Sequence, residues 1–213
     1  MNIKGNAVVL TNGKFDSKSA KTAHGLIRGS SRFNIVAVID SSFSEKYVHV
    51  DNNGKIDLLD SVSNIPIFKD FNSFLQSSSK VDYCIIGVAS AGGLLPDEMR
   101  DDVKLSLTNG ISIINGLHSI LNEDEELVEI SNKSNAKIFD IRASRPRDEL
   151  SFWSGKIYDV KVPKIVVLGT DCGLGKRTTA KLVVENLEKN KIKSDMVYTG
   201  QTGWMQGWEH GFI

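Results

Sequence analysis

The chain has 213 residues, which is enough for one large domain or two small domains with real cores. Its 26 basic residues balance 26 acidic residues without a long run of one sign, so we expect neither a nucleic-acid partner nor an anionic membrane surface. Residues 1–6 lack the apolar core of a signal peptide, and no apolar stretch approaches a membrane span. We therefore expect a cytoplasmic homo-oligomer that acts on a small molecule and keeps Cys84 and Cys172 as reduced thiols.

Short apolar segments rich in β-branched residues alternate with helical patterns over residues 1–142. The expected strands are 7–10, 35–39, 83–88, 111–114 and 136–141. The expected helices are 17–29, a helix that begins at about 96, and 122–134. This alternation predicts an α/β domain in which helices cover both faces of a parallel sheet.

In such sheets ligands bind beyond the carboxyl ends of the strands. The residues that follow strands and are candidates for a substrate site are Asp40, Gly92, Gly93, His118 and Arg142. Asp40 stands where dinucleotide folds carry a ribose-binding acid, but the first loop has Gly13 alone and lacks G-x-G-x-x-G, which weighs against NAD. His118 is either a general base or a hydrogen-bonding loop residue. The glycine pair either admits a ligand closely or only turns the chain.

The periodicity lapses between Arg142 and Pro163, where arginines mix with acidic and aromatic residues. We place a linker at 143–162, between a first domain at 1–142 and a second domain that begins at 163 and continues to 213. The positive charge of this linker either pairs with its own acidic residues or helps to hold an anionic substrate in the cleft between the domains.

Residues 164–180 predict a strand, a glycine-rich turn and a helix. The apolar run 165–168 precedes the turn, and Ala180, Val183, Val184 and Leu187 give the helix an apolar stripe. Backbone N–H groups of the turn, the helix N-terminus and Lys176 bring positive charge to one place, which predicts a phosphate or pyrophosphate site. The alternative is an ordinary tight turn that uses glycine for positive φ. The residues of this phosphate loop are Gly169, Thr170, Asp171, Cys172, Gly173, Leu174, Gly175, Lys176, Arg177, Thr178 and Thr179.

The spacing of this loop departs from the commonest phosphate-loop pattern. That pattern has a Ser or Thr directly after the lysine, where its hydroxyl binds Mg²⁺, whereas here Arg177 follows Lys176. Gly169 and Gly175 also enclose five residues, one more than the pattern has. Chemistry with a magnesium nucleotide is therefore not assured, and we assign no metal site.

Another strand is expected at 195–199, followed by Gly200-Gln-Thr-Gly203. Gln201 and Thr202 follow this strand directly and join the candidate substrate residues. Two parallel strands cannot bury a core, and no later strand ends in an acidic residue that would hold Mg²⁺. We therefore expect either a fragment of a longer protein or a second domain that folds with a partner, and we favour the fragment.

Several motifs together carry a family resemblance that spans essentially the whole chain. They are Gly169-Thr-Asp-Cys-Gly-Leu-Gly-Lys-Arg-Thr-Thr179, Thr199-Gly-Gln-Thr-Gly203, Lys21-Thr-Ala23, Val38-Ile-Asp40, Gly87-Val-Ala-Ser-Ala-Gly-Gly93 and Asn115-Gly-Leu-His118. The chain resembles a bacterial and archaeal family, long of unknown function, with an N-terminal Rossmann-like domain and a C-terminal P-loop domain. One member is described as a D-glutamate N-acetyltransferase that uses acetyl-CoA, and some are loosely labelled NAD-dependent epimerase/dehydratases. The glycine loop alone also resembles that of dethiobiotin synthetase, in which a threonine directly follows the lysine.

Three functions follow from the resemblance. The first is an acetyltransferase whose loop holds the pyrophosphate of acetyl-CoA, whose acceptor amino acid binds between the domains, and in which His118 is the base. The second uses ATP and Mg²⁺ to activate a carboxylate or an amine, in which case Thr178 would have to reach the metal. The third is a module that senses a nucleotide or CoA without chemistry.

Overall fold

The computed structural model describes residues 3–43, 45–60, 64–77, 79–171 and 173–213, so the predicted loop residue Cys172 lies outside the described residues. The chain divides into two compact units. The first unit comprises Met1–Arg142 and Val197–Ile213, and the second unit comprises Ala143–Met196. Residues 197–213 thus group with the first unit, whereas we expected them in the same domain as the phosphate loop.

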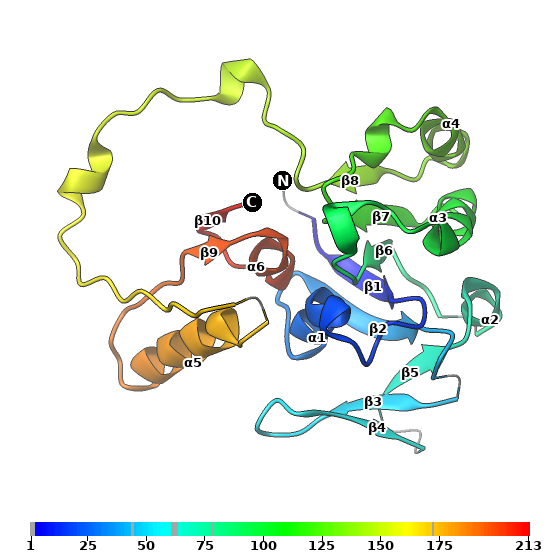
Figure 1. Ribbon diagram of the computed structural model, residues 1–213, viewed down its shortest axis with the longest axis horizontal. Helices are drawn as coiled ribbons and strands as arrows, with labels where there is room; N and C mark the ends of the chain where they lie inside the picture. The colour runs from blue at the N-terminus through cyan, green and yellow to red at the C-terminus, as the bar shows by residue number, and fades with distance from the viewer. Residues whose placement is uncertain (1–2, 44, 61–63, 78, 172) are drawn as a thin grey trace. The chain divides into compact units, whose positions relative to one another are not determined.

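An eight-stranded sheet forms the centre of the first unit (Figure 1). Its strands are β1 (Gly5–Leu10), β2 (Phe33–Ile39), β3 (Tyr47–Val50), β4 (Ile56–Leu59), β5 (Ile65–Phe68), β6 (Tyr83–Ile86), β7 (Ser112–Asn115) and β8 (Ile138–Asp140). The spatial order is β4-β3-β5-β2-β1-β6-β7-β8, in which β3 is antiparallel to both its neighbours and the other pairs are parallel. The expected α/β sheet is confirmed, and its parallel part has the 3-2-1-4-5-6 order of a doubly wound fold.

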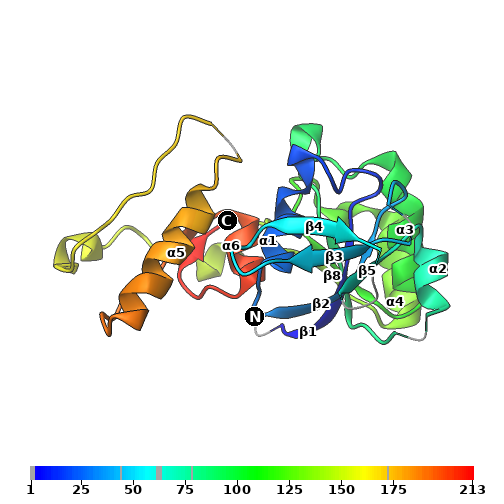
Figure 2. The same cartoon turned by 90° about the horizontal axis from the view of Figure 1, so that it is seen from below.

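Helices cover both faces of this sheet, as Figures 1 and 2 show. One face carries α2 (Phe71–Leu75), α3 (Asp97–Thr108) and α4 (Glu125–Ser134), and the other carries α1 (Lys21–Ile27) and α6 (Gln201–Gln206). Strand β1 explains the two layers, because successive side chains point to opposite faces. Val8 and Leu10 pack in the cluster with α2, α3 and α4, while Ala7 and Val9 pack in the cluster with α1 and α6.

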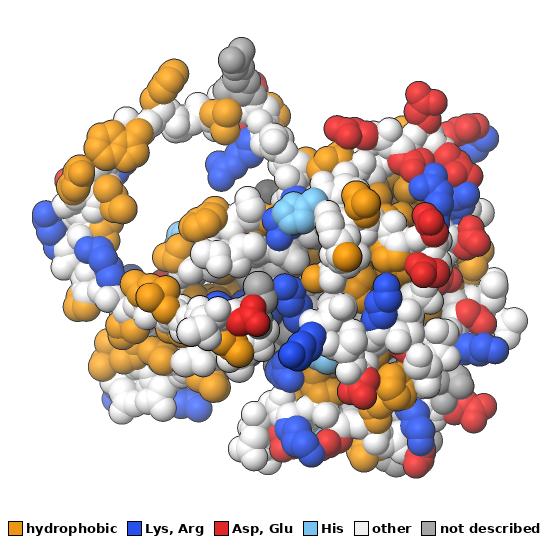
Figure 3. Space-filling model, viewed as in Figure 1, with side chains coloured by type: hydrophobic (Ala, Val, Ile, Leu, Met, Phe, Trp, Pro, Cys, Tyr) orange, Lys and Arg blue, Asp and Glu red, His pale blue; other side chains and the backbone are white. Residues whose placement is uncertain are grey.

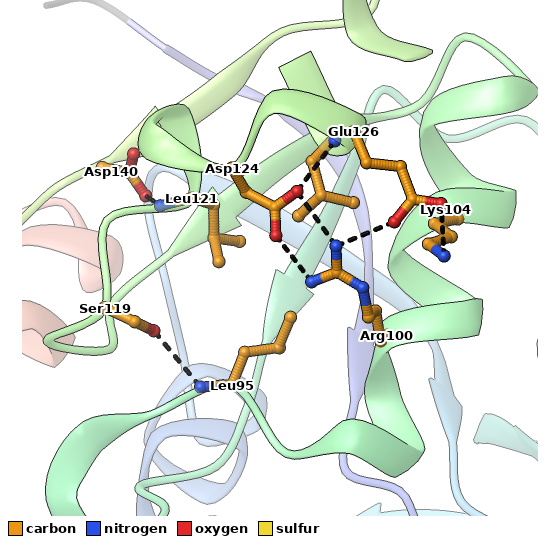
Figure 4. Close-up of polar contacts among 9 residues, drawn as sticks. Leu95, Arg100, Lys104, Ser119, Leu121, Asp124, Glu126 and Asp140 are labelled. Atoms are coloured by element: carbon orange, nitrogen blue, oxygen red, sulfur yellow. Dashed lines mark hydrogen bonds and ion pairs between the residues drawn. The ribbon is translucent and has the colours of Figure 1, made fainter. Parts of the chain in front are cut away.

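A group of ion pairs fastens α3 to the start of α4 (Figure 4). Arg100 donates to both carboxylate oxygens of Asp124, at 2.6 and 2.9 Å, and to Glu126 at 2.9 Å. Asp124 is also the N-cap of α4, since its side chain accepts from the backbone N–H of Leu127. The Arg100 guanidinium holds the pKa of the Asp124 carboxyl below its ordinary value.

Helix α6 joins the first unit although it lies far along the chain. Its Thr202 side chain meets Thr22 of α1 with the two hydroxyl oxygens 3.2 Å apart, and Gln206 donates to the Gly25 carbonyl at 2.7 Å. A Cβ at Gly203 would come within 2.3 Å of Tyr198 Cβ, so only glycine permits this packing. Tyr198 belongs to β9 (Tyr198–Thr199), which pairs in parallel with β10 (Gly211–Phe212). The expected strand 195–199 is therefore only two residues long.

The described part of the second unit contains irregular segments, two short 3-10 helices at Arg147–Glu149 and Lys156–Asp159, and the long helix α5 (Lys176–Lys189). Residues 165–168 do not form the expected strand: none of the described strands pairs with them, and Val166 and Leu168 are 73% and 82% exposed. A strand needs a hydrogen-bonded neighbour, which explains why an apolar run alone does not make one. Hydrophobic side chains, orange in Figure 3, are accordingly visible along α5 and the segment before it. Across the described ranges no helix is both long and apolar enough to cross a membrane.

Candidate functional site

The phosphate loop leads directly into α5, as its sequence predicts. Gly175 is the N-cap residue of this helix with φ of 88°, and Gly173 has φ of 73°. Both values lie in the left-handed region, where a side chain would cost about 1 kcal/mol or more. A Cβ at either position would meet no atom within 4 Å, so the backbone conformation and not the space requires glycine.

The side chain of Lys176 lies over the backbone of the phosphate loop. The Lys176 ammonium donates to the backbone carbonyl of Asp171, and its aliphatic stem lies against Gly169, where a Cβ would come within 3.1 Å of Lys176 Cδ. The first turn of α5 exposes Thr178 and Thr179, and the Thr179 N–H bonds to the Gly175 carbonyl at 2.8 Å. The flanking loop residues Thr170, Asp171 and Leu174 are exposed, whereas Arg177 is half-buried.

A separate cavity of about 420 Å³ lies in the first unit, beyond the carboxyl ends of the sheet strands. We call it the strand-end cavity, and its lining residues are Lys21, Ala89, Ser90, Gly92, Gly93, Gly116, Leu117, His118, Arg142 and Gln201. Its volume falls in the range of small-molecule sites. Five residues predicted from the sequence therefore meet in one place, because the loops after β6, β7 and β8 all open there.

The glycine pair forms one wall of this cavity together with His118. Gly92 and Gly93 have φ of 64° and 69°, and the Gly93 carbonyl accepts hydrogen bonds from the N–H groups of His118 and Ser119. A Cβ at Gly93 would come within 2.4 Å of His118 Cδ2, so glycine permits the imidazole to pack directly on this turn. His118 is exposed on the cavity side of the turn, and its ring makes no hydrogen bond with any residue that the structure describes.

Arg142 and Gln201 form the opposite part of the lining. Arg142 Nε donates to the Gly116 carbonyl at 2.9 Å, and its Nη2 donates to Gln201 Oε1 at 2.6 Å. Gly116 permits this arrangement, since a Cβ there would come within 2.8 Å of Gln201 Cγ. The guanidinium is thus held by two neutral acceptors, and it lines the cavity without a carboxylate partner among the described residues.

Lys21 also lines the cavity, and reasoning from strand ends missed it. It is the first residue of α1 and is exposed. The rule that ligands bind where strands end points to residues directly after a strand, whereas Lys21 comes after a whole loop. The signal that could have identified it is the start of the first helix, which in doubly wound folds faces the same end of the sheet.

Two predicted site residues lie outside the cavity lining, in the core of the first unit. Asp40 is fully buried: its Oδ2 accepts from Thr11 Oγ1 at 2.7 Å and from the Phe15 N–H at 2.9 Å, and its Oδ1 accepts from the Ser42 N–H at 3.0 Å. This carboxylate holds the loop after β1 and presents no free face to a ligand. Thr202 is likewise buried, against Thr22.

Two family models match this chain. One, described as "Domain of unknown function (DUF1611_N) Rossmann-like domain", matches residues 52–144. The other, described as "Domain of unknown function (DUF1611_C) P-loop domain", matches residues 151–213. This chain carries the two domains of the DUF1611 family. The resemblance seen in the sequence motifs is confirmed by these matches.

Relatives of this DUF1611 chain include two proteins named D-glutamate N-acetyltransferase. The one from a Pseudoalteromonas species is 33% identical and the one from Tritonibacter scottomollicae is 29% identical, each over 119 residues, or 56% of this chain. The matched region spans about a third of the length of each relative, 35% and 34%. The crystal structure of a DUF1611 family protein from Anabaena variabilis superimposes with a TM-score of 0.80 at 26% identity, over 98% of this chain and 57% of that chain.

Proposed function

We propose that the protein is an N-acetyltransferase that uses acetyl-CoA and acts on an amino acid such as D-glutamate. The observation that carries this proposal is the phosphate loop, in which a lysine begins the helix but no hydroxyl directly follows the lysine. The names of the two relatives, both D-glutamate N-acetyltransferases, support the same reaction class.

The phosphate loop suits a pyrophosphate that is bound without a metal. The first turn of α5 has backbone N–H groups that lack partners within the helix, and the helix dipole favours negative charge there. Lys176 adds a full positive charge, and the open space around Gly173 and Gly175 leaves room for phosphate oxygens. A hydroxyl in the position of Arg177 would be needed only to hold Mg²⁺.

Acetyl transfer needs a group that accepts a proton from the attacking amine. The amine nitrogen forms a bond to the carbonyl carbon of the thioester as the carbon–sulfur bond breaks, and the proton lost by the nitrogen ends on the departing thiol. His118 is the residue of this chain that suits the task, because its imidazole lines the strand-end cavity and has no side-chain hydrogen bond among the described residues.

One observation favours a second candidate, the ATP-dependent reaction. Thr178 and Thr179 are both exposed in the first turn of α5, close in the chain to the position where a phosphate loop places its magnesium ligand. In that case stabilisation by ATP would require Mg²⁺, whereas stabilisation by acetyl-CoA would not.

Thermal unfolding with each ligand separates the candidates. A ligand at about a hundredfold its Kd adds ~2.7 kcal/mol to the free energy of unfolding, which raises the Tm measurably. We expect acetyl-CoA to raise the Tm of the wild type and of Lys189→Ala, an exposed lysine in the last turn of the same helix, but not of Lys176→Ala. Stabilisation by Mg-ATP without stabilisation by acetyl-CoA would contradict the proposal.

A further inference from the structure

Among the described residues, the lining of the strand-end cavity contains two basic side chains and no acidic side chain. Lys21 contributes an ammonium and Arg142 a guanidinium, and the other lining residues are neutral or, at His118, titratable. Side chains of like charge around one cavity repel each other, and an anionic ligand relieves that repulsion. The positive charge of the lining residues thus favours an anionic ligand.

Neither cation is paired with a carboxylate of the residues that the structure describes. The partners of Arg142 are the Gly116 carbonyl and the Gln201 amide oxygen, and both are uncharged. These two bonds use the Nε–H group and one of the two N–H groups of Nη2, and Nη1 has no partner among the described residues. The Lys21 ammonium makes no ion pair or hydrogen bond with any described residue, and this side chain is exposed. The cavity therefore offers two independent donors to negatively charged oxygens.

We infer that the strand-end cavity binds a short dicarboxylic acid, with one carboxylate on Lys21 and the other on Arg142. The volume of about 420 Å³ suits a ligand of this size. A planar guanidinium held in place by Gly116 and Gln201 matches the two oxygens of a carboxylate, and a lysine adds a compact charge for a second carboxylate.

This site gives the acceptor of the reaction a chemical class, and in that role it rests on the proposed function. A dicarboxylic amino acid bound between the two cations would share the cavity with His118, which is the proposed proton acceptor. Binding of the dicarboxylate itself requires neither acetyl-CoA nor the phosphate loop, because every lining residue belongs to the first unit.

Isothermal titration of the protein with glutarate tests the inference. Glutarate carries two carboxylates and no amine, so it cannot be acetylated, and butyrate is the matched probe with one carboxylate. We expect glutarate to bind at least about tenfold more tightly than butyrate. Its second carboxylate can form one more charged hydrogen bond with the protein, and a bond of this kind accounts for a difference of about that size. The matched variants are Lys21→Met and Lys18→Met, since Lys18 is exposed in the 3-10 turn just before α1 but does not line the cavity.

The expected result is a loss of at least about tenfold in glutarate affinity for Lys21→Met, no change for Lys18→Met, and recovery for Lys21→Arg. Equal affinity for glutarate and butyrate, unchanged glutarate binding by Lys21→Met, or preference for inorganic phosphate over glutarate would each overturn the inference. Acetyl transfer that survives without glutarate binding overturns this inference alone, and glutarate binding without acetyl transfer overturns the proposed function alone.

Discussion

Gln201 Oε1 accepts a hydrogen bond of 2.6 Å from Arg142 Nη2, which joins the end of the sheet to a helix 59 residues later in the chain. Arg142 follows the edge strand β8, and Gln201 begins α6. This contact holds the last helix of the first unit against the carboxyl ends of the strands, where the strand-end cavity opens. The same bond fixes the guanidinium at the cavity lining, so we expect the stability of this unit and the proposed ligand binding to depend on one contact.

Removal of this bond should destabilise the first unit. We expect Gln201→Ala to lower the free energy of unfolding by about 1–2 kcal/mol, since it leaves a half-buried cation without one of its acceptors. Urea denaturation measures the effect, and substitution of Gln76, the exposed C-cap residue of α2, by alanine should change the free energy of unfolding by less than about 0.5 kcal/mol. Equal effects of the two variants would mean that the Arg142 bond contributes nothing.

Alanine substitutions at the two adjacent glycines of the cavity wall distinguish the cost of backbone strain from the cost of a steric clash. Gly92→Ala and Gly93→Ala both place a side chain at positive φ, at a cost of about 1 kcal/mol each. Only the Gly93 variant also forces a Cβ against His118, whereas at Gly92 the nearest atom, Leu94 Cγ, is 3.9 Å away. We expect Gly93→Ala to be the less stable by a further ~1 kcal/mol or more and to displace the His118 ring. Denaturation curves of the two variants measure the difference in stability, and the NMR signals of His118 report the displacement of its ring. Indistinguishable denaturation curves for the two variants would refute the predicted clash.

We expect substitution of the buried Asp40 to lower the stability of the first unit. Asp40→Asn replaces one acceptor oxygen with a donor, so at least one of the donors on Thr11, Phe15 and Ser42 loses its partner. We expect a loss of about 2 kcal/mol in the free energy of unfolding, and about 1 kcal/mol for Thr11→Val. The exposed carboxylate Asp60, which pairs with Lys46, is the control, because surface ion pairs contribute at most about 1 kcal/mol. A loss for Asp40→Asn no larger than that for Asp60→Asn would contradict this account.

His24 should make the first unit less stable in mild acid. Burial lowers the pKa of this imidazole, against a raising effect of its contact with the Phe15 carbonyl at 2.7 Å; Arg28 lowers the pKa further and Asp16 raises it. Below the ordinary histidine pKa of about 6.5 the unfolded chain binds a proton that folded His24 does not, so stability falls as the pH falls through this range. Denaturation at about pH 7.5 and about pH 5.5 should show a larger decrease for the wild type than for His24→Gln. An equal decrease in the wild type and in His24→Gln would exclude this role of His24.

The order of strands and helices in the first unit was predictable, because each apolar run pairs with a neighbour and packs against an amphipathic helix. β1, β2, β6 and β7 all coincide with predicted runs, and α3 begins directly after Pro96 as its sequence indicates. Strands β3, β4 and β5, which form one side of the sheet, were missed since they have four residues each and are mostly half-buried, which leaves too short a pattern.

Tertiary contacts account for the other differences. The six residues of α6 carry no repeating stripe, and the helix is held by Thr22, Gly116 and Arg142, which no local pattern reveals. The run 165–168 has the composition of a strand without a strand beside it. In the same way, strand ends revealed His118 and Arg142, but Lys21 required knowledge of where α1 begins.

The most direct test of the proposed function is an assay of acetyl transfer from acetyl-CoA to a panel of D- and L-amino acids, with released thiol and acetylated product both quantified. We expect transfer to dicarboxylic amino acids, D-glutamate among them, a loss of about 10²–10⁴ in kcat for His118→Ala, and a raised KM for acetyl-CoA in Lys176→Ala. Absence of transfer to every member of the panel, or full activity of Lys176→Ala with an unchanged KM for acetyl-CoA, would contradict the account.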